Sequence, residues 1–419
     1  MMTELKDTLL LLLLLSMMLM AVSCSDHDEI YMVPSEDFAS DTTATTSAPD
    51  TTDTVPVIPS ARITGEVTYP AYPLLRNLNF VYPSKDPWGK PVMLSGTITM
   101  SRSMTSATKA RGFILYNHYT VCRADECPSK GKLDMQNIIY ELAPYRNFIT
   151  VSADYYGFGE TEDQMQAYCV ASANARASLD ALTAARQLLA DEGYTWYNEL
   201  LNVGYSQGGQ TTMAVLRMAT EEYPDIRFSR TLAGGGPYDL EATYREYLAD
   251  GKAKLPSAVV NILMAYNEYF HLGISAEEMF QEPTLSHIDD WWLSKQYSST
   301  TIDRKMGTGD ITQFIAPPLR DLDSDVSKRM MEALGRENLC QGWTPRSDEH
   351  ILLLHHENDE IVPLVNTRNM YDFLKRQGVE DVELRVNDYF SLGISDHVSG
   401  AVAFLTIVAL WIRDEYEIS

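Results

Sequence analysis

The chain has 419 residues, of which 45% are hydrophobic, and it carries a formal net charge of −25 with an isoelectric point near 4.6. A chain of this length and composition can bury one large core, or one core with an inserted subdomain. Its acidic balance disfavours binding to nucleic acid and adsorption to anionic lipid, because both partners are negatively charged. The charge selects no substrate, and its simplest role is to keep an exported protein soluble.

The first 23 residues have the pattern of an export signal. The run Leu9–Val22 is apolar except for Ser16, and it is shorter than the roughly 20 residues that a membrane-spanning helix needs. Ala21-Val22-Ser23 then precedes Cys24, which resembles the lipobox of bacterial lipoproteins. We therefore predict a signal peptide over 1–23 and lipidation of Cys24, with ordinary secretion as the alternative. The protein would be exported and anchored in the outer membrane or at the cell surface, touching the membrane through its lipid only.

A low-complexity segment follows the cysteine. From about Ser35 to Ser60 the sequence is rich in Thr, Ser, Asp, Ala and Pro and has no apolar periodicity. Such a segment cannot bury enough apolar surface to offset the entropy of ordering it. We expect a flexible tether over 24–60.

Four further cysteines follow Cys24. Cys122 and Cys127 are close together in one predicted loop, and an oxidising compartment permits disulfides, so these two are the favoured pair. Cys169 and Cys340 are isolated in the sequence. Because no Cys-x-x-Cys or Cys/His cluster accompanies them, no metal site is predicted.

After the tether, short apolar runs alternate with helical stretches. Phe80–Tyr82 and Val92–Met100 flank a turn rich in Pro and Gly and predict an antiparallel hairpin. The pattern then predicts strands over Gly112–Tyr116, Phe148–Ala153, Leu200–Gly204, Ser229–Ala233, Ile351–Leu354 and Val382–Val386, and helices over Leu133–Tyr145, Cys169–Leu189, Gln210–Tyr223, Thr367–Arg376 and Val398–Tyr416. This alternation indicates an α/β fold with a mostly parallel sheet between helices.

One region interrupts the alternation. Between about Asp239 and Pro345 the sequence has helix-like segments and no convincing strand. We expect an all-helical cap over 239–345, inserted into an α/β core formed by 61–238 and 346–419.

A strand-to-helix turn carries the candidate nucleophile. Gly204-Tyr205-Ser206-Gln207-Gly208 has the Gly-x-Ser-x-Gly pattern, with a predicted strand before it and a helix after it. Glycine is needed on both sides because larger side chains would clash in so tight a turn. The turn lifts the Ser206 hydroxyl above the sheet and directs the Gln207 N–H and the helix N-terminus toward a developing oxyanion.

Two later positions complete a triad. Asp359 lies just past the end of the strand at Ile351–Leu354, where open α/β sheets place functional groups. Glu357 and Glu360 are rivals for the role of the acid. His397 lies beyond the last strand and just before the last helix. The order serine, acid, histidine then assigns Ser206 as nucleophile, Asp359 as acid and His397 as base.

The loop Leu115–Thr120 should supply the second oxyanion donor. The triad order resembles that of α/β-hydrolases, many of which have His-Gly-x in this loop and use the backbone N–H of x. Here His118 is followed by Tyr119 in place of the Gly, and then by Thr120. Thr120 N–H is the first choice and Tyr119 N–H the second. Because His118 precedes the nucleophile in sequence, we expect it to have a structural role in the loop.

These motifs resemble the α/β-hydrolase superfamily, in particular its secretory lipase and bacterial carboxylesterase branch. The resemblance runs from about Tyr82 to the C-terminus and includes Ala153–Gly159, the Gly204 turn and the Asp359–Pro363 stretch. It implies hydrolysis of carboxylic esters through an acyl-serine intermediate. A tethered surface enzyme can reach polymers, so a polysaccharide-linked ester is a candidate substrate beside a small-molecule ester. It implies no metal and no organic cofactor.

Two other functions remain open at this level. A serine peptidase of prolyl-oligopeptidase-like ancestry uses the same triad order, but such enzymes carry a large β-rich N-terminal domain. A non-catalytic binding lipoprotein would not require a complete triad. The sequence determines neither the acyl chain length nor the oligomeric state.

Overall fold

The computed structural model describes residues 59–67, 74–130, 147–387 and 395–416. The predicted signal peptide, Cys24, most of the tether and the predicted helix Leu133–Tyr145 lie outside these residues. The described part contains nine strands that form one sheet: β1 (Arg62–Val67), β2 (Leu75–Lys85), β3 (Pro91–Ser101), β4 (Lys109–Asn117), β5 (Phe148–Ala153), β6 (Thr195–Tyr205), β7 (Arg230–Gly234), β8 (His350–His356) and β9 (Asp381–Asn387).

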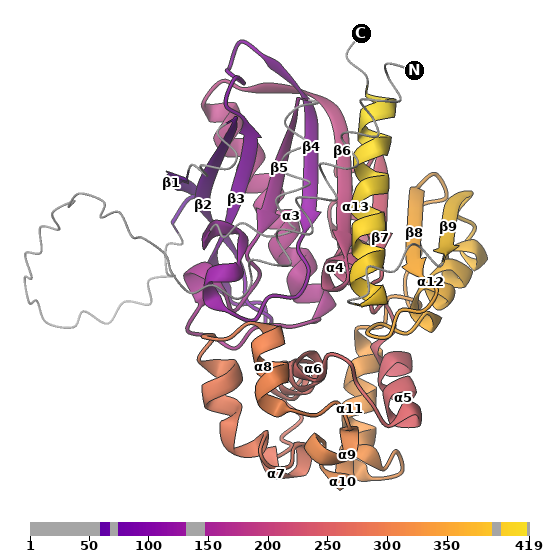
Figure 1. The fold of residues 1–419 in the computed structure, drawn as a ribbon. Helices are drawn as coiled ribbons and strands as arrows, with labels where there is room; N and C mark the ends of the chain where they lie inside the picture. The colour runs from indigo at the N-terminus through magenta and orange to yellow at the C-terminus, as the bar shows by residue number, and fades with distance from the viewer. Residues whose placement is uncertain (1–58, 68–73, 131–146, 388–394, 417–419) are drawn as a thin grey trace, which may run out of the picture. The chain divides into compact units, whose positions relative to one another are not determined.

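The sheet is antiparallel at one end and parallel over the rest. Its strand order is β1-β2-β3-β5-β4-β6-β7-β8-β9, and β1, β2, β3 and β5 pair in antiparallel fashion. From β5 through β4 to β9 every pair is parallel. This confirms the predicted hairpin and the mostly parallel α/β sheet (Figure 1).

The structure differs most from the expected strands at β1. This strand was not predicted, because the sequence Arg62–Val67 has few apolar side chains and its residues are mostly exposed. It pairs only with β2, so it needs no second apolar face. The interior strand β5 is buried along its whole length and matches the predicted Phe148–Ala153.

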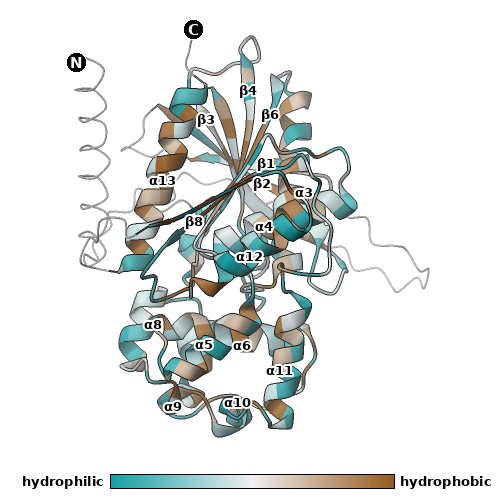
Figure 2. Ribbon diagram, turned by 90° about the vertical axis from the view of Figure 1, so that its right-hand side faces the viewer, coloured by the Kyte–Doolittle hydropathy of each residue, from teal (hydrophilic) through white to brown (hydrophobic). Residues whose placement is uncertain are grey.

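Helices cover both faces of the sheet (Figure 2). On one face lie α3 (Ala171–Asp191), α4 (Gln207–Glu222) and α12 (Val365–Arg376), and on the other lies α13 (Asp396–Glu415). Among the described helices, only α13 is long and apolar enough to cross a membrane. Because α13 packs against β7 and β8 and most of its apolar stretch is buried, we interpret it as a core helix.

Between β7 and β8 the chain forms helices at the end of the sheet where the parallel strands finish (Figure 1). In the described chain this segment has isolated bridges but no strand. Its α-helices are α5 (Leu240–Asp250), α6 (Pro256–Tyr269), α7 (Ala276–Met279), α8 (Ser299–Met306), α9 (Ile311–Phe314), α10 (Pro317–Arg320) and α11 (Asp325–Arg336). The same segment contains the single-turn helix η5 (Leu285–His287) and a π turn at η6 (Asp289–Leu293). Single-turn helices before it in the chain are η2 (Ala124–Glu126), η3 (Pro128–Lys130) and η4 (Gly159–Thr161).

Polar contacts fasten this helical segment to the rest of the fold. Asn366 of α12 accepts a hydrogen bond from Asp239 N and donates one to Thr243 Oγ1. The buried Lys295 ammonium donates to the backbone carbonyls of Glu162 and Gln164. The contacts at the start of the segment and at Lys295 both use backbone or buried groups, where a hydrogen bond contributes more than at an exposed site.

The predicted disulfide between Cys122 and Cys127 is wrong, because all four cysteines in the described chain are free thiols. The two side chains face different surroundings. Cys122 belongs to the main apolar core and accepts a hydrogen bond from Asn261 Nδ2, whereas the Cys127 thiol donates to Ala124 O within its own turn. Proximity in sequence therefore does not bring the two sulfurs together.

Candidate active site

Ser206 lies on the tight turn between β6 and α4. Its φ of +59° is in the left-handed region, which a non-glycine residue adopts only when the surrounding structure holds it there. A hydrogen bond from Ser206 N to Gly234 O, at 2.9 Å, holds the turn against β7. The strained turn and the position after a buried strand are those expected for a nucleophilic serine at the end of an α/β sheet.

The glycines around Ser206 are required by close backbone approach. A Cβ on Gly204 would lie 2.3 Å from Gly208 O, and a Cβ on Gly208 would lie 2.1 Å from Asn117 O. A Cβ on Gly209 would lie 2.3 Å from Gly234 O. The Gly-x-Ser-x-Gly-Gly sequence therefore lets the start of α4 touch the loop after β4 and the end of β7 at once.

The structure brings the three predicted triad residues into one hydrogen-bonded chain. His397 Nε2 lies 2.9 Å from Ser206 Oγ, and His397 Nδ1 lies 2.6 Å from Asp359 Oδ2. Ser206 and His397 are 9% and 7% exposed. Because Asp359 accepts the Nδ1 proton, Nε2 is left with a lone pair directed at the serine hydroxyl, which is the tautomer that a general base needs.

Asp359 is a buried carboxylate, and both of its oxygens accept hydrogen bonds. Its side chain is inaccessible to solvent, and its Oδ1 accepts hydrogen bonds from Ile361 N and Val362 N, at 2.9 and 2.8 Å. Burial alone would raise the pKa of Asp359, but the charge of His397 and the hydrogen bonds outweigh it and hold this pKa below its usual value. The group is therefore an anion at neutral pH.

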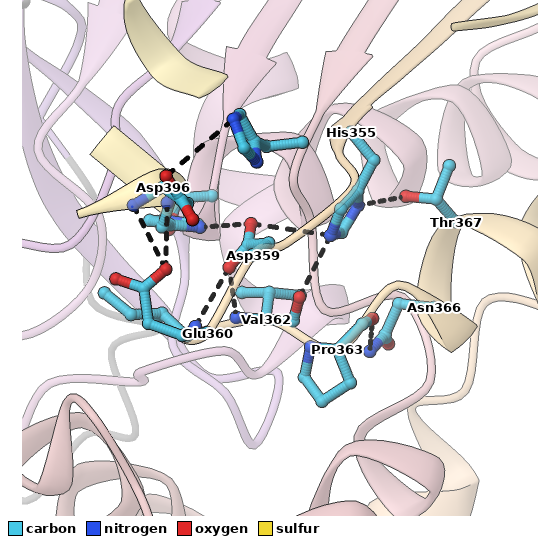
Figure 3. A network of polar contacts seen from close by, with 12 residues as sticks. His355, Asp359, Glu360, Val362, Pro363, Asn366, Thr367 and Asp396 are labelled. Atoms are coloured by element: carbon cyan, nitrogen blue, oxygen red, sulfur yellow. Dashed lines mark hydrogen bonds and ion pairs between the residues drawn. The ribbon is translucent and has the colours of Figure 1, made fainter. Parts of the chain in front are cut away.

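A second histidine supports this carboxylate. His355, at the end of β8, is fully buried, and its Nε2 lies 2.9 Å from Val362 O and 3.4 Å from Asp359 Oδ2 (Figure 3). Its Nδ1 lies 2.6 Å from Thr367 Oγ1. Burial lowers the pKa of His355 despite the nearby carboxylate, so the ring stays neutral and Nε2 carries its proton. Sequence reasoning assigned no role to His355, although two adjacent histidines at a strand end are a visible signal.

The rival acids have other positions. Glu360 caps the N-terminus of α13: its carboxylate accepts hydrogen bonds from Ser395 Oγ, Asp396 N and His397 N (Figure 3). Glu357 is exposed. Of the three candidates, only Asp359 contacts the His397 ring in the described chain.

The predicted oxyanion donors lie at the start of α4 and in the loop after β4. Gln207 is the first residue of α4, and the glycine contacts place this helix start directly against the loop at Asn117 and His118. His118 is fully buried, stacks on Tyr155 with ring centroids 4.0 Å apart, and contacts Tyr119 O and Asp154 O. Thr120 Oγ1 contacts the hydroxyl of Tyr168.

Tyr205, next to the nucleophile, was not singled out from the sequence. Its hydroxyl donates to His397 O at 2.8 Å, and its ring centroid lies 5.1 Å from that of the His397 imidazole. A tyrosine beside a serine gives no sequence signal for this contact, because the contact spans 192 residues. Within the described ranges, no group of three or more His, Cys, Asp or Glu side chains is placed to hold a metal ion.

The comparison with protein families identifies the chain. The family model described as secretory lipase matches residues 130–418. This chain belongs to the secretory lipase family. Membership supports ester hydrolysis as the class of reaction and export as the fate of the chain. No curated protein sequence matches this chain significantly.

Solved structures show that this secretory lipase family member shares the α/β-hydrolase fold. The rice cell wall degrading esterase LipA from Xanthomonas oryzae has 19% identity and a TM-score of 0.68, covering 85% of this chain and 97% of its own. A putative hydrolase from Legionella pneumophila has 20% identity and a TM-score of 0.72 over the same shares. Candida antarctica lipase A has 14% identity and a TM-score of 0.61, covering 86% of this chain and 83% of its own.

Proposed function

We propose that this protein is a serine hydrolase of carboxylic esters, with Ser206 as nucleophile, His397 as general base and Asp359 as the acid that orients it. The observation that carries the proposal is the Ser206–His397–Asp359 hydrogen-bonded chain on a positive-φ turn. Membership of the secretory lipase family supports an ester as the substrate. Both the geometry and the family favour acyl transfer over binding without catalysis.

Acylation follows from this geometry. Ser206 Oγ attacks the ester carbonyl carbon while His397 Nε2 takes the hydroxyl proton, and Asp359 stabilises the resulting imidazolium. The tetrahedral intermediate carries its negative charge on the former carbonyl oxygen. The backbone N–H of Gln207 and that of Thr120 or Tyr119 stabilise this oxyanion. His397 then protonates the leaving alcohol as its C–O bond breaks.

Deacylation repeats the same steps with water. His397 takes a proton from a water molecule that attacks the acyl-serine carbon, and the second tetrahedral intermediate collapses. His397 returns the proton to Ser206 Oγ, and the carboxylic acid leaves. The cycle consumes one ester and one water and needs no group beyond the chain itself.

The helical segment 239–345 is proposed as the cap that forms the substrate pocket, inserted into a core of 61–238 and 346–419. Tyr247 of α5 donates a hydrogen bond to Ile361 O, two residues from Asp359. The cap and the acid loop are therefore in direct contact. One similar protein, LipA, is described as a cell wall degrading esterase, so acetyl and feruloyl sugar esters belong among the substrates to test.

Anchoring is a separate proposal. Cys24 would be lipidated after removal of residues 1–23, and the tether 24–60 would hold the catalytic domain away from the membrane. Labelling of the wild-type chain, but not of Cys24→Ala, with an alkyne fatty acid in a Gram-negative host would support it. Equal labelling of both chains would contradict it without affecting the catalytic proposal.

The decisive experiment is hydrolysis of p-nitrophenyl esters from acetate to long acyl chains, together with feruloyl and acetylated sugar esters, by the wild-type chain and by Ser206→Ala. We expect turnover by the wild type and loss of about three orders of magnitude or more in kcat in the variant. The chain-length profile would then measure the depth of the acyl pocket.

Asp359→Asn serves as a second test with little change in shape. Asn keeps an oxygen acceptor for Ile361 N and Val362 N, but its amide would present an N–H to His397 Nδ1 and impose the wrong tautomer. We expect a folded protein whose kcat is about 10³- to 10⁴-fold lower. Turnover that persists in Ser206→Ala, or cleavage of peptide substrates with no ester turnover, would overturn the proposed function.

A further inference from the structure

The peptide group between Tyr119 and Thr120 is trans, since the only cis peptide bond in the described chain precedes Pro283. In a trans peptide the carbonyl and the N–H point in opposite directions. Any side chain that fixes the direction of Tyr119 O therefore also fixes the direction of Thr120 N–H.

His118 holds that carbonyl. Its Nδ1 lies 2.7 Å from Tyr119 O, and its Nε2 lies 3.3 Å from Asp154 O. Burial lowers the pKa of His118 to about 4, so the ring is neutral and has one proton. Both ring nitrogens face a carbonyl oxygen, and the repulsion between a nitrogen lone pair and that oxygen is greater at the shorter distance, so we assign the proton to Nδ1, which makes the 2.7 Å contact. Stacking on Tyr155 fixes the plane of the ring.

The order of the strands shows the direction in which His118 holds the Tyr119 carbonyl. In the sheet, β4 lies between β5 and β6. Asp154 and Tyr155, the partners of His118, directly follow β5, whereas Ser206 directly follows β6. His118 therefore pulls Tyr119 O toward the β5 side, and Thr120 N–H is turned toward the side of the nucleophile.

The peptide group between His118 and Tyr119 has the opposite direction, so that the Tyr119 N–H points away from the nucleophile turn. A Cβ on Gly208 would lie 2.9 Å from His118 O, so that carbonyl faces the start of α4. The N–H of Tyr119, on the same trans peptide, then points away from α4. These two peptide directions favour Thr120 N–H over Tyr119 N–H as the donor on the side of the nucleophile.

We propose that His118 is a positioning residue whose hydrogen bond to Tyr119 O turns Thr120 N–H into the second donor of the oxyanion hole. The inference rests on the proposed function, because it concerns the oxyanion of the Ser206 reaction. His118 touches neither substrate nor reacting atoms in this scheme. It acts through the orientation of one peptide group.

The test compares His118→Asn with His118→Gln and His118→Ala. The Asn amide nitrogen occupies nearly the position of His Nδ1 and can still donate to Tyr119 O. The Gln amide nitrogen corresponds to Nε2 and reaches Asp154 O instead. Both variants keep a buried amide, so they are matched in polarity and differ in which carbonyl they hold. Thermal unfolding of each variant reports whether it is folded.

With p-nitrophenyl esters, we expect His118→Asn to retain most of the wild-type kcat. His118→Gln and His118→Ala should lose about 100-fold in kcat with KM little changed, the loss expected for one oxyanion donor. A trifluoromethyl ketone, whose hemiketal oxygen occupies the oxyanion hole, should bind the Gln and Ala variants more weakly by a similar factor and bind the Asn variant normally.

Two results would overturn the inference: His118→Asn as impaired as folded His118→Gln, or a fall in kcat with unchanged affinity for the trifluoromethyl ketone. Failure of the proposed function is distinguishable, because Ser206→Ala would then retain turnover and the ketone would not bind the wild type.

Discussion

The carboxylate of Glu360 accepts a hydrogen bond from the backbone N–H of His397, at 3.3 Å, while the neighbouring Asp359 binds the imidazole of the same histidine. Two consecutive acids of one loop therefore hold one residue at its ring and at its backbone. Glu360 also accepts from Ser395 Oγ, the N-cap of α13, so it neutralises the positive end of that helix.

Replacing Glu360 with Ala should lower both stability and activity. Loss of a helix cap is expected to cost about 1 kcal/mol in the free energy of unfolding. Displacement of His397 should lower kcat about 10- to 100-fold, since small errors in the position of a base are costly. Steady-state kinetics and denaturant unfolding measure the two effects. The control is Glu357→Ala, because Glu357 is exposed on the same loop; equal effects in both variants would contradict the assignment.

Substitution of Gly208 with Ala should separate the nucleophile turn from the loop after β4. The new Cβ would lie 2.1 Å from Asn117 O, and neither backbone can move freely. We expect a loss of about 1–3 kcal/mol in the free energy of unfolding and a strong fall in kcat.

The matched control is Gly335→Ala, in α11. There the nearest atom is the end of the flexible Glu241 side chain, at 3.4 Å, so the substitution should be neutral or stabilise by up to about 1 kcal/mol. A stable, fully active Gly208→Ala enzyme would refute the close approach described for this turn.

The raised pKa of the Asp303 carboxyl leads us to expect a specific pH dependence of the free energy of unfolding. Asp303 caps α6 by accepting from Ser257 N, and burial raises its pKa from 3.8 to about 6. The folded state thus binds the proton more tightly than the unfolded state. Its contribution to stability is greatest below about pH 4 and is lost as the pH rises through 6.

Asp303→Asn keeps an acceptor and removes the charge. We expect it to be more stable than the wild type by about 1–2 kcal/mol at pH 7, after discounting for partial exposure, and not at pH 4. Unfolding curves at both values measure the difference. In contrast, Asp310→Asn should not stabilise, because hydrogen bonds with Thr312 lower the pKa of this exposed carboxylate. The same gain at both pH values would contradict the argument.

The free thiols predict insensitivity to reducing agent. Burial raises the pKa of both Cys122 and Cys127, so neither should react readily with a thiol reagent in the folded protein. We expect the same melting temperature with and without dithiothreitol, and reaction of Cys122 and Cys127 with a thiol reagent only on unfolding. An intact mass lower by two hydrogens, with a melting temperature that falls on reduction, would show that Cys122 and Cys127 form a disulfide and would contradict this prediction.

Local pattern was enough to predict much of this protein. The alternation of apolar runs and helical stretches predicted the parallel strands, because a strand buried on both faces must be apolar along its length. The Ser206 turn was recognisable because its glycines and its flanking strand and helix lie within a few residues of one another. The hairpin of β2 and β3 was visible for the same reason, whereas the polar edge strand β1 gave no apolar signal.

Other features depended on the three-dimensional arrangement of distant residues. Three acids within four positions were equivalent in sequence, and the direction of each side chain at the end of β8 decided that Asp359 meets the ring of His397 and Glu360 its backbone. The directions of the two thiols likewise decided that Cys122 and Cys127 stay apart. The sequence determined which elements form because periodicity is local. Only the tertiary structure decided which side chains meet, because those contacts join strands and helices far apart in the chain.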